Sequence, residues 1–146
     1  MASYYVNEAA FGLTERPFVD KTVHALESKL TSGQTRAVFV HRRPIEGAKS
    51  LRELVDEHVA VNETRLAAFA VVDDVAAAVG GLPGVLLRTR WRHGGATFCQ
   101  RQAHVAVEGQ VMIFAVSAPI AESAACDETF DSIVQTLAWR APPAAL

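Results

Sequence analysis

Residues 86–105, LLRTRWRHGGATFCQRQAHV, concentrate the side chains of this sequence that could do chemistry. Within this segment lie four arginines, two histidines, one cysteine and two aromatic rings. Guanidinium groups bind phosphates and aromatic rings stack on bases, so the composition would suit a nucleic-acid binder if both kinds of side chain shared one surface. A thiol beside an imidazole would instead suggest a nucleophile and its base. The fold of the segment decides between these possibilities.

The pair Gly94–Gly95 predicts a two-residue hairpin turn, because such turns need residues that adopt positive φ angles. Pairing outward from this turn places Trp91 opposite Phe98. Alternate residues of a strand point to opposite faces, so the side chains divide into two sets. One face carries Arg88, Arg90, Arg92, Cys99 and Arg101, and the other carries Leu87, Thr89, Trp91, Phe98, Gln100, Gln102 and His104.

This division separates the arginines from the rings, which argues against single-strand nucleic-acid binding. The arginine face is predicted to be solvated, with acidic residues near it. Cys99 and His104 lie five residues apart and therefore on opposite faces, so they are not expected to form a catalytic dyad.

The ring-bearing face raises a different question, because Gln100 and Gln102 lie among its apolar side chains. Burying an unpartnered amide costs about 1–3 kcal/mol. A groove for an apolar helix would resolve this, since the amides could bond the backbone or hydroxyl groups of that helix. Alternatively, the glutamines lie under a helix of this chain and bond its backbone.

The clearest helix begins at Ser50, where SLRE predicts a capping box. Its apolar stripe is Leu51, Leu54, Val55, Val59 and Leu66. His58, Asn62 and Leu66 recur at i, i+4 and i+8 and form a second line along the edge of this stripe. The two polar members of that line are either half-exposed boundary residues or part of a binding surface.

The remaining segments predict an α+β fold, an antiparallel sheet with helices packed on it. Strands are expected within residues 4–13, 21–29 and 36–43, the last of them central in the sheet. Residues 68–84 are expected to form a strand, a turn and a short strand, with Asp73–Asp74 at the turn or on a solvated edge. A three-stranded meander follows, and then a C-terminal helix with Asp127 as a plausible N-cap and an apolar face made by Phe130, Ile133, Val134 and Leu137.

Composition and the absence of known motifs restrict the domain count, the function class and the expected location of the protein. The 146 residues are 50% apolar and carry a net charge of -2, which predicts one domain (residues 1–140) with a flexible tail (141–146). No phosphate-binding glycine motif, metal-ligand spacing or catalytic constellation occurs, so no enzyme activity, metal or cofactor is expected. The N-terminus does not resemble a secretory signal and no run could span a bilayer, so we expect a cytoplasmic protein with Cys99 and Cys126 reduced.

The chain resembles the DcrB-related proteins, and most closely the Eag-type chaperones of type VI secretion effectors. The resemblance covers residues 3–139. It rests on YYVNEAAFGL, on Asp20 in FVDKTVHAL, on SLRELVDEHVAVNETRL, on GGLPGVLLRTRWRHGGATFCQRQAHV and on ETFDSIVQTL. The proline and tryptophan usual in this family after the second strand are replaced here by TERPF.

The resemblance implies a PsbP-like fold and a homodimer that holds the N-terminal transmembrane helices of an effector before export. The partners would be that effector and, through it, the secretion spike; no direct membrane insertion is implied. The client helices would lie on the sheet and on the flank of the first helix. The expected binding residues are Val23, Ala25, His58, Asn62, Leu66, Phe98 and Gln102, together with Trp91 and Gln100 from the hairpin face. The alternative is a general protein-interaction module of the same fold without a membrane-helix client.

Overall fold

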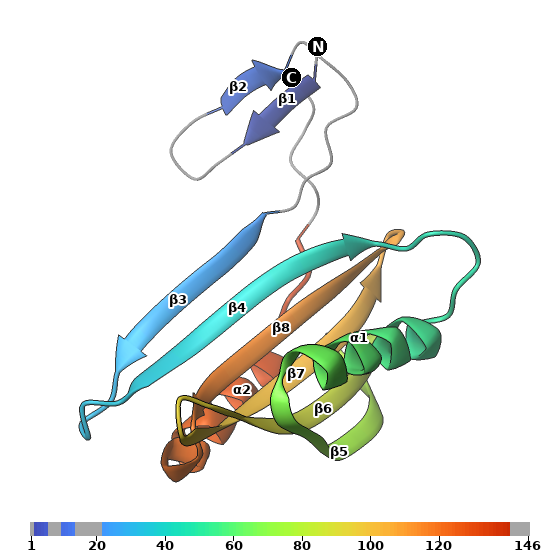
Figure 1. Cartoon of the computed structure of the whole chain (residues 1–146). Helices are drawn as coiled ribbons and strands as arrows, with labels where there is room; N and C mark the ends of the chain where they lie inside the picture. The colour runs from blue at the N-terminus through green and yellow to red at the C-terminus, as the bar shows by residue number, and fades with distance from the viewer. Residues whose placement is uncertain (1, 6–9, 14–21, 141–146) are drawn as a thin grey trace.

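A computed structural model of the chain describes residues 2–5, 10–13 and 22–140 (Figure 1). The tail 141–146, Asp20 and the TERP segment lie outside these residues. The elements, in chain order, are β1 (Ala2–Tyr5), β2 (Ala10–Leu13), β3 (Val23–Lys29), β4 (Thr35–Pro44), α1 (Leu51–Arg65), β5 (Ala67–Val79), β6 (Leu82–His93), β7 (Ala96–Val107), β8 (Gln110–Pro119), the short 3₁₀ helix η1 (Ile120–Glu122) and α2 (Ser123–Thr136).

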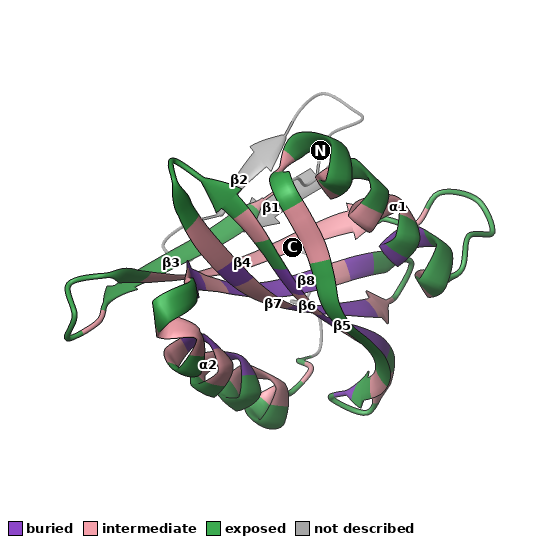
Figure 2. Cartoon of the chain, turned by 60° about the horizontal axis from the view of Figure 1, so that its bottom comes forward, coloured by how far each residue is buried: buried purple, intermediate pink, exposed green. Residues whose placement is uncertain are grey.

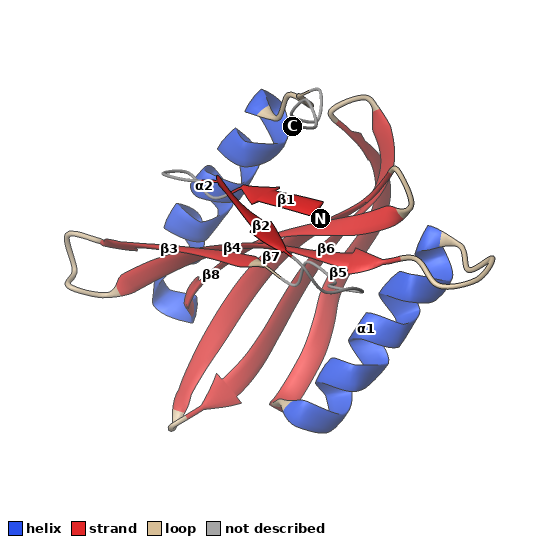
Figure 3. Ribbon diagram, turned by 90° about the horizontal axis from the view of Figure 1, so that it is seen from above, coloured by secondary structure: helices blue, strands red, loops and turns tan. Residues whose placement is uncertain are grey.

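The sheet that dominates the fold has six antiparallel strands in the order β3-β4-β8-β7-β6-β5. β1 and β2 pair with each other in a separate two-stranded sheet. The predicted α+β class is therefore confirmed, and β4 lies inside the sheet as expected. Seen from above, α1 and α2 lie on opposite faces of the six-stranded sheet (Figure 3).

The two helices build separate cores because successive side chains of each strand point to opposite faces of the sheet. α1 buries Leu54 and Val55 on the face that carries Val85, Leu87 and Ile113. α2 buries Cys126 and Phe130 on the other face, against alternate residues of β7 and β8: Cys99, Ala103, Val105, Phe114, Val116 and Ala118. The buried residues accordingly gather in the strands between the helices (Figure 2).

The hairpin of β6 and β7 has the register predicted from the sequence. Trp91 pairs with Phe98, and the ladder continues to Gly84 and Val105. Gly94 and Gly95 adopt φ angles of 58° and 79°, which is the positive-φ pair that a type I′ turn requires.

The start of α1 is also close to the prediction. The Ser50 side chain accepts a hydrogen bond from the Glu53 backbone N–H at 3.1 Å. This is one half of the predicted capping box, and it satisfies a donor that the first helical turn leaves without a partner. The helix ends at Arg65, so Leu66 lies at its C-cap.

Two local predictions are wrong. Residues 67–79 form one continuous edge strand, β5, rather than a strand, a turn and a short strand, and its register shifts between Val71 and Asp73. A β-bulge therefore absorbs the irregularity that the adjacent acidic residues suggested, although they do lie on an edge as the other alternative stated. Asp127 is not an N-cap, because α2 begins earlier, at Ser123.

Candidate functional site

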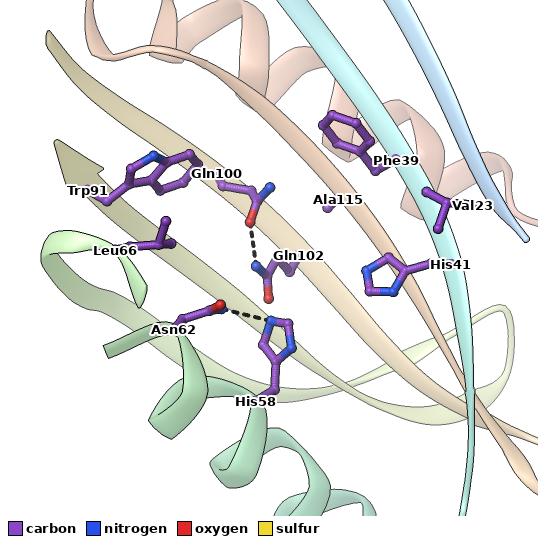
Figure 4. Close-up of a pocket in the computed structure, with 10 residues that line it drawn as sticks. All are labelled: Val23, Phe39, His41, His58, Asn62, Leu66, Trp91, Gln100, Gln102 and Ala115. Atoms are coloured by element: carbon purple, nitrogen blue, oxygen red, sulfur yellow. Dashed lines mark hydrogen bonds between the residues drawn. The ribbon is translucent and has the colours of Figure 1, made fainter. Parts of the chain in front are cut away.

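A cavity of about 360 Å³ opens on the face of the sheet that α1 covers (Figure 4). We call it the α1 cavity. β3 and β4 form one side of it, α1 and its C-cap form the other, and β6, β7 and β8 form the floor. Its ten lining residues are Val23, Phe39, His41, His58, Asn62, Leu66, Trp91, Gln100, Gln102 and Ala115.

Seven of the nine predicted binding residues line this cavity. They come from three distant segments: Val23 from β3; His58, Asn62 and Leu66 from α1 and its end; and Trp91, Gln100 and Gln102 from the hairpin. The line at i, i+4 and i+8 therefore does face the same space as the amide-bearing strand. That these residues bind a client helix remains a prediction.

The other two predicted residues do not line the cavity. Ala25 is exposed on β3, where it pairs with Phe39. Phe98 is half-buried and stacks on Trp91, with ring centroids 6.0 Å apart. Phe98 thus supports a ring that lines the cavity.

Three lining residues were missed by sequence reasoning: Phe39, His41 and Ala115. Their positions follow from the sheet register, since Phe39 pairs with Ala115 and Ala115 with Gln102. Phe39 and His41 lie on the same face of β4 because alternate residues of a strand share a face. The pairing of β4 with β8, however, joins strands that are far apart in the sequence. No local signal predicts that pairing.

The two glutamines satisfy each other rather than the backbone of a helix. The Gln102 amide Nε2 donates to the Gln100 carbonyl Oε1. The Gln102 carbonyl oxygen then lies 2.8 Å from His104 Nε2. Gln102 is only 3% exposed, so these bonds offset a desolvation cost of about 1–3 kcal/mol that an unpartnered amide would incur.

α1 extends this polar row with two more side chains. The His58 ring packs edge-on against the His104 ring, with centroids 4.8 Å apart. Asn62 Nδ2 lies 3.1 Å from His58 Nε2. The row Gln100–Gln102–His104–His58–Asn62 therefore crosses the floor of the cavity from β7 to α1.

Burial keeps the imidazoles of this region neutral. It is the largest cause that lowers the pKa of His41 and of His58, where His41 and Arg43 add to the effect. It also lowers the pKa of His104 to about 3, with further contributions from the charges of His58 and His41. None of the ten lining residues is a carboxylate. The cavity is therefore an uncharged surface at neutral pH.

The arginine face of the hairpin has acidic residues near it, as predicted, but it is only partly solvated. Arg88 and Arg101 donate to the Asp127 carboxylate from α2, at 2.8 Å and 2.9 Å. Arg101 also lies over the Phe130 ring, 4.4 Å from its centroid. Arg90 and Arg92 are exposed. The paired arginines thus attach a helix of this chain to the sheet.

Both cysteines belong to this same α2 face. Cys99 and Cys126 are free and buried. Their thiols donate to backbone carbonyls of one strand, Cys99 to Ala118 and Cys126 to Val116. Cys99 lies on the face opposite His104, as predicted.

Across the described ranges, no group of three or more histidines, cysteines or acidic residues has a geometry that could hold a metal ion. Nor does any helix in those ranges have the length and apolar character needed to cross a bilayer. The α1 cavity therefore offers apolar surface, amides and neutral imidazoles.

Comparison with known proteins decides the family. The DcrB family model matches residues 8–136. This chain belongs to the DcrB family. No curated protein sequence matches it.

Solved structures show the same fold at low identity. PA94 from Pseudomonas aeruginosa, a protein of unknown function described as a putative regulator, aligns with a TM-score of 0.82 at 18% identity and covers 96% of this chain and 97% of its own. LpqN of Mycobacterium tuberculosis, involved in cell envelope biogenesis, gives a TM-score of 0.58 at 15% identity over 75% of this chain and 65% of its own. CyanoP, the cyanobacterial PsbP of Synechocystis, gives 0.55 at 13% identity over 77% of this chain and 79% of its own. The DcrB-family chain therefore has a PsbP-like fold.

Proposed function

We propose that this DcrB-family protein is a non-catalytic cytoplasmic chaperone that shields the N-terminal transmembrane helices of a type VI secretion effector before export. The observation that carries the proposal is the α1 cavity. It combines exposed or half-buried apolar side chains at its rim with a polar row that bonds within itself. The resemblance to Eag-type chaperones supplies the client class and the expectation of a homodimer.

The rim of the cavity matches the needs of an apolar helix. Val23 is 57% exposed on the edge strand, and Leu66 and Trp91 are half-buried on the other side. Each square ångström of apolar surface removed from water contributes about 25 cal/mol, so a client helix of about 20 residues gains substantially from covering this rim. A volume of about 360 Å³ accepts protruding side chains rather than a whole helix. The client would therefore lie across the sheet with some of its side chains in the cavity.

The polar row also suits an apolar partner. An apolar helix offers few donors or acceptors, so any cavity amide that it left without a partner would weaken binding. Gln102 and His104 already bond within the row. A client can therefore cover Gln102, which lines the cavity, without a large desolvation cost. Amide atoms of Gln100 and Asn62 that the row does not use can bond a Ser or Thr of the client.

Co-expression with the N-terminal transmembrane fragment of a type VI secretion effector, chosen from the genes adjacent to this one, tests the proposal. We expect a soluble complex that purifies through a tag on either partner. Leu66→Asp places a charge at the cavity rim and should abolish the complex. The matched control is Ala60→Asp, which adds the same charge to an exposed position of α1 that does not line the cavity.

Two outcomes would contradict the proposal. If Leu66→Asp folds and still holds the client, the α1 cavity is not the binding site. If the wild-type protein leaves the fragment insoluble but captures a soluble domain of a neighbouring protein, the general interaction module is the better description.

A further inference from the structure

Hydrogen bonding in the α1 cavity fixes where the protons of two histidines lie. The Gln102 amide donates to Gln100, so its carbonyl oxygen faces His104 Nε2. A carbonyl oxygen only accepts, which requires the proton of the neutral His104 ring to be on Nε2. The Asn62 amide nitrogen faces His58 Nε2, and an amide nitrogen only donates. Nε2 of His58 must therefore be the unprotonated, accepting atom, with the proton on Nδ1.

A second proton on His58 would go to the same Nε2 that accepts from Asn62. Two donors would then face each other across 3.1 Å. Rotating the Asn62 amide by half a turn removes this conflict, because it brings Oδ1 to the imidazolium. The NH₂ group then points to where Oδ1 was. One proton thus changes both the charge of the cavity and the polarity of an amide that lines it.

Among the groups that act on the pKa of His58, only the neutral Gln102 amide favours the charged form. β7 contributes this amide, whose hydrogen bond raises the pKa against the larger effect of burial, and the His104 ring; β4 contributes His41 and Arg43. On α1 itself, the nearby carboxylate of Glu57 is held by Arg43 and Lys49.

Arg52, which also acts on His104, is paired with Asp56 and Asp74. The ten cavity-lining residues include no acid. A protonated His58 would therefore have the Gln102 amide but no cavity-lining carboxylate to stabilise its charge beneath an apolar helix.

We propose that protonation of His58, with rotation of the Asn62 amide, is an acid switch that makes the α1 cavity release an apolar helix. This rests on the proposed function, since it concerns regulation of the same site. Helix binding and proton binding exclude each other, because an imidazolium covered by apolar side chains loses its hydration. Burial and the neighbouring positive groups already lower the pKa of His58 below its ordinary value of 6.5. The cavity is therefore competent at neutral pH, and its affinity falls in mildly acidic solution.

A peptide without ionisable groups gives a clean binding probe. We suggest a blocked helix of about 20 Leu and Ala residues with a polyethylene glycol tail, measured by fluorescence anisotropy between about pH 7.5 and pH 5. Release coupled to one proton raises Kd about tenfold per pH unit below the pKa of His58 in the free protein. His58→Gln should lose this slope, whatever its affinity at neutral pH. Asn62→Asp should move the transition to higher pH, because a carboxylate beside His58 stabilises the imidazolium.

Nuclear magnetic resonance of the protein without a client tests the switch independently of helix binding. The ring nitrogens of His58 should report the Nδ1–H form at neutral pH, and the side-chain NH₂ signals of Asn62 should shift with His58 on acidification. In His41→Gln, which removes the other lining imidazole, the Asn62 signals should still follow pH. In His58→Gln they should not.

The possible results test the switch, its control of helix release and the proposed function separately. If His58 carries its proton on Nε2 at neutral pH, or the Asn62 signals ignore its titration, the switch is wrong. If the switch is seen but His58→Gln keeps the wild-type slope of Kd, the switch does not control release. If the peptide does not bind the wild-type protein at neutral pH, the proposed function fails together with its regulation. His24→Gln, which removes an exposed histidine of β3 outside the cavity, is the control and should behave as wild type.

Discussion

His104 makes the folded protein sensitive to mild acid. Its side chain is 1% exposed, and its Nε2 donates to Gln102. Burial is the main cause that lowers its pKa from 6.5 to about 3, with contributions from the charges of His58 and His41. The pKa is lower in the folded state, so the unfolded chain binds the proton first. Stability is therefore fully present above pH 6.5 and is lost as the pH falls toward the folded-state value.

The size of the effect follows from linkage. At about pH 5 the unfolded imidazole is almost fully protonated and the folded one is neutral, which removes about 2 kcal/mol relative to about pH 8. Most carboxylates stay ionised over this interval, so it isolates the histidines. In urea unfolding at the two pH values, the wild-type free energy of unfolding should fall by at least about 2 kcal/mol. His41 and His58 add to the loss in the same direction, because burial lowers their pKa values too.

The perturbation is His104→Gln, whose amide N–H can still donate to the Gln102 carbonyl. This variant should lose about 2 kcal/mol less than wild type over the same interval, although it is less stable at neutral pH because it leaves a cavity. His24→Gln on the exposed edge strand serves as the control. Equal pH dependence in wild type and His104→Gln would refute the reasoning, since it would mean that the buried ring does not resist protonation.

Three further results are expected. Asp127→Ala should destabilise the protein by about 1–3 kcal/mol in denaturant unfolding, because it leaves Arg88 and Arg101 without their shared partner; Asp127→Asn should lose less. Gly80→Ala should cost at least about 1 kcal/mol and change the tryptophan fluorescence, because φ is 58° and the added Cβ would lie 2.6 Å from Trp139 Nε1. The two buried cysteines should resist a thiol reagent in the folded protein and react fully in denaturant; rapid labelling under native conditions would contradict their burial.

The sequence predicted what local rules control. The β6–β7 register follows from two glycines that accept positive φ, and every pair outward from the turn is then determined. The start of α1 follows in the same way from Ser50. Because strand period is strictly 2, the register of the hairpin is enough to separate its arginine face from its amide face.

Features that depend on packing between distant elements could not be predicted from the sequence. Asp127 resembles a helix cap in sequence, yet α2 begins earlier and uses this carboxylate to bind two arginines of the sheet. The acidic pair in β5 resembles a turn, but on an edge strand a bulge accommodates it. The contact between His104 and His58 depends on how α1 docks, which neither segment encodes alone.

The two faces of the hairpin satisfy their polar groups in different ways. On one face, Arg88 and Arg101 are matched by a carboxylate of α2, so both charges are used to hold the chain together. On the other face, Gln102 and His104 bond within a neutral row, and α1 leaves a cavity above it. Replacing both partners of a buried hydrogen bond by apolar side chains of the same shape can be nearly neutral for stability, so a row of this kind is not needed for the fold alone. Neutral amides and imidazoles beside a partly exposed apolar rim are what the proposed binding and release of an apolar helix would need.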